Sequence, residues 1–333
     1  MLRKILKIVA GVLVLAVGLL GAGYLYISFT WDRDYSATPM PAITASTEPD
    51  TIARGEYIVH SVAHCSACHL LASNPKGEPI DWNKGMTGGY TWEAPMFGTF
   101  VAANITPDPE TGIGAWSDAE LARAIRHKVG RNGKVLPFMF FAVGPMSDDD
   151  LSAVVSYLRS RPPVRQVNGP ESWGLIAKAI AGSFAPRLEP PPAHVAPGPG
   201  PSVDRGRYLT TGPAACGTCH TSRDPLTFAI NGAPLSGSAM AEPDGGNPGY
   251  EFVYPNLTPD PETGHITSWD EDTFLKRLHG GRIHAASPMP WENYQRMTDD
   301  DVRSIYRYLR TLPPTRQLIG PPHRKVGDEP KGA

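Results

Sequence analysis

The chain has 333 residues, a formal net charge of −2, and 41% hydrophobic and 9% aromatic residues. Plentiful aromatic residues exclude a wholly disordered chain, and the lack of a basic excess argues against a nucleic-acid-binding protein. Glycine and proline together form about a fifth of the chain, whereas an average protein contains about 12% of them. This excess predicts loop-rich domains, and the length predicts about two of them.

Residues 8–29 form an uncharged, largely apolar stretch near the N-terminus. A helix of that length spans about 33 Å, enough to cross a hydrocarbon core of about 30 Å. Basic residues at positions 3–7 precede the stretch and acidic residues follow it, which places the N-terminus in the cytoplasm and the remainder outside. A cleaved signal peptide is the alternative, but its apolar region is normally shorter. We therefore expect residues 1–35 to form a retained transmembrane anchor.

The rest of the chain is a tandem repeat. The sequence CSACH at Cys65–His69 recurs 151 residues later as CGTCH at Cys216–His220. Downstream, NITPDPETG from Asn104 matches NLTPDPETG from Asn256. Other matched segments are Arg54-Gly55-Glu56-Tyr57 with Arg205-Gly206-Arg207-Tyr208, and Trp116 with Trp269. We expect one domain at 36–185 and a second at 203–333, joined by a proline-rich linker at 186–202.

Each half is predicted to consist of helices around irregular loops. A helix over Thr51–His64 leads into the first cysteine motif, and Ser117–Glu120 forms a capping box that opens another. Ser147 and Thr298 cap the final helices, whose apolar residues recur at i, i+3, i+4 and i+7. Residues 173–184 read as a short apolar helix that either packs on its own domain or contacts a partner or membrane. The expected fold class is all-α.

The motif C-x-x-C-H is the signature of c-type haem attachment. Two thiols three residues apart can reach both vinyl groups of one porphyrin, and the histidine then faces the iron. A redox dithiol would sit in a strand–helix context, and a four-cysteine zinc site would need the two cysteine pairs to meet. Because a histidine follows both pairs, we favour two covalently attached haem c groups, held by Cys65, Cys68, His69, Cys216, Cys219 and His220.

Two repeated methionines are candidates for the second axial ligand of each iron. Met139 and Met289 lie in proline-containing, irregular chain, which suits a preorganised thioether ligand, and Met/His ligation raises the haem potential. Met146 and Met297 immediately precede helix N-caps and are expected to pack as hydrophobic staples instead. The metal ligands are therefore expected to be His69, Met139, His220 and Met289.

Other histidines are given supporting roles. The free ring nitrogen of each ligand histidine should donate to a backbone carbonyl, with the loops around Pro75 and Pro225 as candidates. His60 and His64 are expected at the surface or the haem edge, and His284 is a candidate partner of a haem propionate.

Taken together, these motifs resemble the cytochrome c subunits of membrane-bound periplasmic dehydrogenases of the alcohol and gluconate type. The likeness covers roughly residues 50–165 and 203–318. The resemblance implies two class I cytochrome c domains of all-α fold. It also implies electron transfer from a dehydrogenase toward a quinone-linked acceptor or an oxidase, without a catalytic site on this chain. The haem residues that it implies are those named above.

We therefore predict a dihaem electron carrier with one helix in a bacterial inner membrane and its haem domains in the periplasm. Its partners would be redox proteins, and it would not bind nucleic acid. A haem-bearing subunit of a terminal oxidase is one alternative. A dihaem peroxidase is another, but it would need an open sixth position on an iron, and both halves offer a methionine there.

Overall fold

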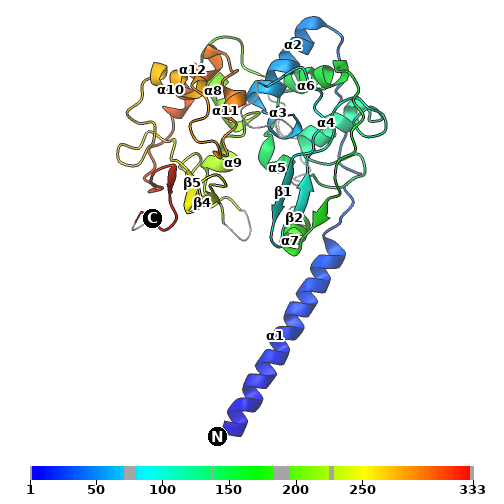
Figure 1. Cartoon of the computed structure of the whole chain (residues 1–333), viewed down its shortest axis with the longest axis vertical. Helices are drawn as coiled ribbons and strands as arrows, with labels where there is room; N and C mark the ends of the chain where they lie inside the picture. The colour runs from blue at the N-terminus through cyan, green and yellow to red at the C-terminus, as the bar shows by residue number, and fades with distance from the viewer. Residues whose placement is uncertain (1, 71–79, 137, 184–195, 225–228, 331–333) are drawn as a thin grey trace.

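The computed structural model describes residues 2–70, 80–136, 138–183, 196–224 and 229–330. One long N-terminal helix, α1 (Leu2–Thr30), leads into two halves that lie side by side (Figure 1). Its segment Arg3–Thr30 is long and apolar enough to cross a membrane. Most of the linker predicted at 186–202 lies outside the described residues, which resume at Ala196.

The two halves have similar orders of helices and strands. Elements of the first half are α2 (Pro49–Tyr57), the π-helix η1 (Ile58–Val62), α3 (Ser66–His69), β1 (Thr91–Ala94), β2 (Gly98–Val101), α4 (Asp118–His127), α5 (Met139–Ala142), α6 (Asp148–Ser160), β3 (Ser172–Trp173) and α7 (Leu175–Ser183). Elements of the second half are α8 (Val203–Thr211), α9 (Gly217–His220), β4 (Ser238–Pro243), β5 (Tyr250–Tyr254), α10 (Glu271–His279), α11 (Trp291–Tyr294), α12 (Asp299–Leu309) and β6 (His323–Lys325).

The prediction of an all-α fold is wrong, because each half also contains a three-stranded antiparallel sheet. The strand orders are β1-β2-β3 and β4-β5-β6. In the first sheet Trp92 pairs with Phe100, and Gly98 pairs with Trp173. Five of the strands lie in chain that the sequence predicts to be irregular, whereas β3 overlaps the start of the helix expected over residues 173–184. They are short, and the third strand of each sheet comes from chain beyond α6 or α12, so local periodicity does not reveal them.

One pair of helices in each half, α2 with α6 and α8 with α12, crosses at a glycine. A Cβ atom on Gly55 of α2 would lie 1.9 Å from the carbonyl oxygen of Ala153 in α6. Likewise, a Cβ atom on Gly206 of α8 would lie 1.8 Å from the carbonyl oxygen of Ser304 in α12. Any larger residue would push the helices apart, because a packed interior has no room for the extra atom. The repeated R-G-x-Y motif therefore contains the helix-crossing glycine of each half.

The predicted helix starts are confirmed. Ser117 accepts from the backbone N–H of Glu120, whose carboxylate accepts from Ser117 N in return, which completes the capping box of α4. Ser147 caps α6 and Thr298 caps α12 through the same type of bond. The helix expected over residues 51–64 instead divides into α2 and η1.

The apolar helix α7 packs on its own half, where that half meets the end of α1. Ala181 is buried in a small cluster with Tyr35 and Val129, against which Trp31 and Trp173 also pack. The rings of Trp31 and Trp173 lie 4.9 Å apart. Figure 1 places α7 beside the junction between α1 and the first half.

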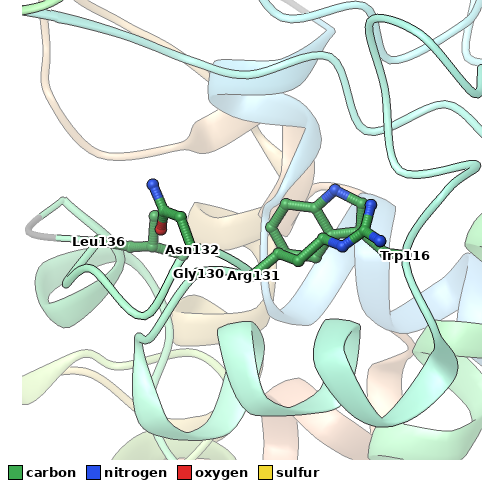
Figure 2. A pocket seen from close by; sticks show the side chains of 5 residues that line it. All are labelled: Trp116, Gly130, Arg131, Asn132 and Leu136. Atoms are coloured by element: carbon green, nitrogen blue, oxygen red, sulfur yellow. The ribbon is translucent and has the colours of Figure 1, made fainter. Parts of the chain in front are cut away.

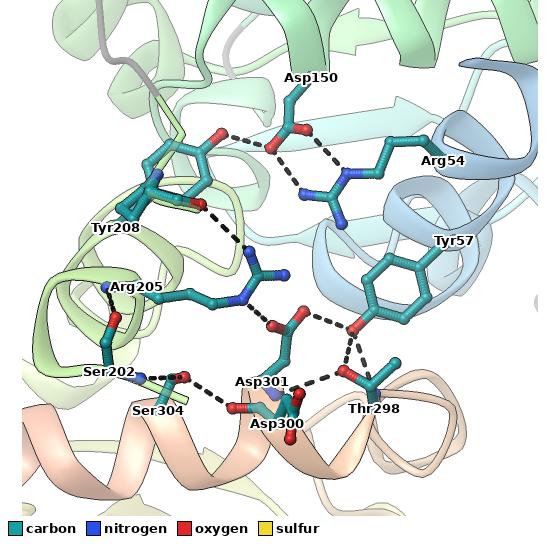
Figure 3. A network of polar contacts seen from close by, with 11 residues as sticks. Arg54, Tyr57, Asp150, Ser202, Arg205, Tyr208, Thr298, Asp300, Asp301 and Ser304 are labelled. Carbon is teal, nitrogen blue, oxygen red and sulfur yellow. Dashed lines mark hydrogen bonds and ion pairs between the residues drawn. The ribbon is translucent and has the colours of Figure 1, made fainter. Parts of the chain in front are cut away.

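One arginine–aspartate pair joins the crossing helices in each half (Figure 3). Arg54 of α2 binds Asp150 of α6 through two bonds of 2.9 and 3.0 Å. In the second half, Arg205 of α8 donates from Nε to Oδ1 of Asp301 in α12. Both aspartates are almost fully buried, so their charges need these partners.

Two tyrosines from the same motifs join the halves to each other. The Tyr57 hydroxyl donates to Asp301 across the interface at 2.6 Å, and the Tyr208 hydroxyl donates to Asp150 at 2.6 Å (Figure 3). We call these two bonds the tyrosine clasp. Each tyrosine oxygen also accepts the N–H of the residue that caps the opposite helix. Burial and the neighbouring carboxylate raise the pKa of both tyrosines well above the usual value, so they remain protonated donors.

Candidate functional site

Both C-x-x-C-H motifs fold as a single helical turn. The turns are α3 and α9, and in each the histidine N–H donates to the carbonyl of the first cysteine at 3.0 Å. The residue before each motif has a positive φ, 41° at His64 and 49° at Ala215, which starts the turn sharply. Cysteines at i and i+3 of one turn lie on the same face. The thiols of each pair are therefore presented together, next to the imidazole that follows them.

The orientation of each histidine ring is set by a backbone carbonyl. Nδ1 of His69 lies 2.7 Å from the carbonyl oxygen of Ala103, and Nδ1 of His220 lies 3.0 Å from that of Pro255. A carbonyl only accepts, so the proton is on Nδ1 and the lone pair is on Nε2. Burial lowers the pKa of both rings, to about 4 for His220, which keeps them neutral. A carbonyl partner was predicted, but the loops proposed for it, at Pro75 and Pro225, lie outside the described residues.

The repeated N-x-T-P-D motif builds the loop that supplies this carbonyl. Asn104 directly follows Ala103, and its side-chain oxygen accepts from the N–H and hydroxyl of Thr106 at 3.0 and 2.8 Å. Its amide donates to the carbonyl of Val164, beyond the end of α6, at 2.8 Å. Asn256 makes the matching bonds in the second half, with the carbonyl of Thr315 as the acceptor. Both asparagines are therefore loop braces that position the histidine acceptor.

The candidate methionines lie on the same core clusters as the cysteine motifs. Met139 begins α5 and packs half-buried against the first cluster, as do Cys65 and Trp116. Met289 precedes α11 and packs against the second cluster, as do Cys216 and Trp269. Met146 and Met297 are buried within those clusters. There Met146 joins Leu151, and Met297 joins Val302, as expected for hydrophobic staples.

A pocket of about 500 Å³ opens in the first half beside the chain that leads to Met139 (Figure 2). Trp116 lines it together with residues of the turn after α4, namely Gly130, Arg131, Asn132 and Leu136. Its size is in the range of ligand pockets, which are about 300–1,000 Å³. The pocket therefore adjoins the region where Cys65, Trp116 and Met139 share one cluster.

The two alternatives to haem find no support in the geometry. No group of three or more His, Cys, Asp or Glu side chains within the described ranges could hold a metal ion, so the cysteine pairs do not form one zinc site. None of the four cysteines forms a disulfide. Burial raises the pKa of Cys65 and Cys216 to about 12, opposite to the lowered values of reactive dithiols.

Three other histidines differ in environment. The expectation of a surface position for His60 is wrong, because the residue is 1% exposed and its Nε2 lies 2.7 Å from the Tyr157 hydroxyl, whereas a position at the haem edge stays a prediction. His64 is half-buried with its ring 5.9 Å from that of Tyr294 in the other half. His284 has its ring 4.2 Å from that of His323 in β6.

The sequence analysis missed the residues that connect the halves near the site. The R-G-x-Y repeat was recognised, but the partners of Tyr57 and Tyr208 were not predicted. Asn293, just after Met289, donates to the carbonyl of His60 at 2.9 Å and to Ser66 Oγ, inside the first cysteine motif, at 2.7 Å. No repeat signals Asn293, because its role depends on how the halves dock.

Comparison with known proteins finds similar chains among redox subunits. An alcohol dehydrogenase (quinone) cytochrome c subunit of Gluconacetobacter polyoxogenes is 33% identical over 292 residues, covering 82% of this chain and 58% of that subunit. A gluconate 2-dehydrogenase cytochrome c subunit of Pantoea cypripedii is 34% identical over 284 residues, covering 78% and 59%. A diheme cytochrome c-type protein of Cereibacter sphaeroides is 30% identical over 268 residues, covering 78% and 85%. No family model matches the chain.

Proposed function

This chain belongs to the family of dehydrogenase cytochrome c subunits and related dihaem c-type cytochromes, and from that premise we propose that it relays electrons between two haem groups in a membrane-associated dehydrogenase complex. It contains covalently bound haem c, as members of the family do. The observation that carries the proposal is the repetition, in both halves, of a C-x-x-C-H turn whose histidine has Nδ1 bound to a carbonyl. The chain spans about three fifths of the length of the dehydrogenase subunits that it matches, so partner and electron donor belong to the proposal.

The residues of each half fit the haem group by their chemistry. The neutral imidazole keeps its Nε2 lone pair for the iron, and the two protonated thiols lie on the same turn, ready to form thioethers. We assign Cys65, Cys68, His69 and Met139 to one haem, and Cys216, Cys219, His220 and Met289 to the other. When bound, the haem supplies a one-electron couple whose potential depends on its axial ligands.

The surrounding chain has two tasks in this proposal. The asparagine-braced loops hold each imidazole in one orientation, which limits the rearrangement that accompanies each change of oxidation state. The tyrosine clasp and Asn293 hold the halves against each other, so that the two haem sites keep one relative arrangement. A fixed arrangement favours transfer within one molecule over collisions between molecules.

The proposed environment follows from α1. We propose that it is retained as a single-pass anchor in the inner membrane, with residues 36–185 and 203–333 as periplasmic haem domains joined by the 186–202 linker. The donor would be a periplasmic dehydrogenase, and the acceptor would be a quinone-linked protein or an oxidase. The apolar character of α1 and the basic residues at positions 3–7 support this orientation.

The test is a haem count on the full chain, purified from membranes in detergent, combined with carbon monoxide binding. We expect two haems per chain, retained after denaturation because they are covalent, and no carbon monoxide adduct at neutral pH in the reduced protein. One haem per chain, or a carbon monoxide adduct at either haem, would contradict the dihaem relay. Co-purification of a dehydrogenase would identify the donor.

A further inference from the structure

The loop that leads to Met289 is held by one guanidinium group. Arg282 binds Glu292 of α11 through two bonds of 2.6 Å, from Nε to Oε1 and from Nη2 to Oε2. The same side chain donates from Nη1 to the carbonyl of Ser287 and from Nη2 to the carbonyl of Met289 at 3.3 Å. Arg282 therefore contacts both the methionine backbone and the helix that follows it.

The surrounding contacts make this loop stiff. Trp291 Nε1 donates to Ser287 Oγ at 3.1 Å, so α11 is tied to the loop a second time. The guanidinium of Arg277 lies 3.7 Å from the centre of the Trp291 ring and donates to the carbonyl of Gly281 at 2.7 Å. A planar guanidinium that is bonded on several edges at once fixes direction as well as distance, which a lysine ammonium does not.

The first half holds its methionine differently. Arg131 stands 151 residues before Arg282, at the offset that separates the two cysteine motifs, but it pairs with Glu120 at 3.3 Å. The N–H of Met139 instead donates to the carbonyl of Leu136 at 3.0 Å, and Met139 lies within the helical turn α5. Backbone bonds thus shape the first loop, whereas a side chain braces the second.

We propose that Arg282 is a positioning residue for the sixth ligand of the second haem. By fixing the carbonyls of Ser287 and Met289, it limits the positions that the Met289 thioether can take and so favours the iron-bound one. Loss of the brace would let the thioether leave the iron more readily, and a soluble ligand such as imidazole would then compete better. This inference rests on the proposed function, since it takes Met289 as an axial ligand.

The experiment is an imidazole titration of the oxidised full-length protein carrying Arg282→Gln, followed by the far-red absorption band of methionine-ligated ferric haem. We expect the affinity for imidazole to rise at one haem per chain by about tenfold or more. A tenfold change in affinity corresponds to about 1.4 kcal/mol, and the loss of one hydrogen bond to a charged group is of that size or larger. The potential of one of the two redox waves should fall as well. Arg282→Lys should recover only part of the effect.

The matched control is Arg316→Gln, which removes an exposed arginine of the same half that pairs with Glu262 at 2.9 Å, and it should leave both haems unchanged. An unchanged imidazole affinity in Arg282→Gln would overturn the positioning role, as would an equal change at both haems. Met289→Ala separates this inference from the assignment beneath it. If Met289→Ala leaves the far-red band intact, the ligand assignment itself fails. If Met289→Ala removes one haem's share of the band while Arg282→Gln leaves the imidazole affinity unchanged, only the role of Arg282 fails.

Discussion

The two halves agree on the histidine side of each candidate haem site and differ on the methionine side. Each histidine is oriented by a carbonyl that precedes a braced asparagine, and the two braces match bond for bond. By contrast, Met139 lies in a helical turn, whereas Met289 lies in a loop tied down by Arg282. The duplicated chain thus repeats the scaffold of the attachment side and varies the segment with which axial ligation, and hence potential, can be adjusted.

The largest difference between the halves should come from removing one haem attachment site at a time. Cys65→Ala with Cys68→Ala, or Cys216→Ala with Cys219→Ala, should reduce the haem content from two to one per chain, because no other cysteine can form the thioethers. Haem per chain after acid–acetone extraction is the measurement. If either double variant still retained two covalent haems, the assignment of one haem to each half would be wrong.

Helix crossing should be the next most sensitive feature, and the same in both halves. Gly55→Ala or Gly206→Ala places a methyl group within 2 Å of a backbone carbonyl oxygen, so the helices must separate. We expect a loss of about 3 kcal/mol or more in the free energy of unfolding, measured by urea denaturation. Gly169→Ala is the control, since no atom lies within 4 Å of its would-be Cβ. Equal stability of all three variants would contradict the close crossing.

The tyrosine clasp should act between the halves and not within either. Tyr57→Phe and Tyr208→Phe each remove one donor to a buried carboxylate, which should cost about 1–3 kcal/mol. Together they should split a joint unfolding transition into two, as followed by haem absorbance and circular dichroism. Tyr306→Phe removes a bond within the second half, to the carbonyl of Trp269, and should lower stability without splitting the transition. A single transition in the double variant would contradict the clasp.

Removing the asparagine that braces one histidine loop should have a smaller effect, on the midpoint potential of the haem in that half only. Asn104→Ala frees the loop that holds the carbonyl of Ala103, and Asn256→Ala does the same for Pro255. Each should shift the midpoint potential of one haem only, by the equivalent of about 1 kcal/mol, since the histidine loses a fixed acceptor. Redox potentiometry measures this. The exposed Asn83→Ala is the control. A shift of both waves by either variant would show that the braces do not act locally.

Low pH should reduce the stability of the two halves to the same extent. Bonds from Thr111 lower the pKa of Asp108 below its usual value, and bonds from Thr263 do the same for Asp260. A lowered pKa in the folded state means that this stability is present above pH 3.8, the ordinary value, and is lost as the pH falls through the lowered one. Asp108→Asn should therefore flatten the acid limb of the stability curve slightly, and Asp260→Asn equally. Unequal slopes would show that the two turns differ.

Much of the helical scaffold and the kind of site could be predicted from the sequence, because both depend on local patterns. The helix N-caps, the repeated cysteine turns and the staple methionines all follow from residues within a few positions of each other. The sheets were missed because β3 and β6 reach their partners from distant parts of the chain. The acceptors Ala103 and Pro255 were missed for a similar reason. A carbonyl is common to every residue, so only the fold selects one.

The tyrosine clasp makes each repeat depend on the sequence of the other. Each aspartate encoded by one repeat is completed by a tyrosine encoded by the other. Substitution of the tyrosine in one repeat therefore removes a hydrogen bond from the aspartate of the other repeat. The two repeats depend on each other at these positions, and either segment expressed without the other would lose the hydrogen bond that its aspartate accepts from the tyrosine of the missing segment.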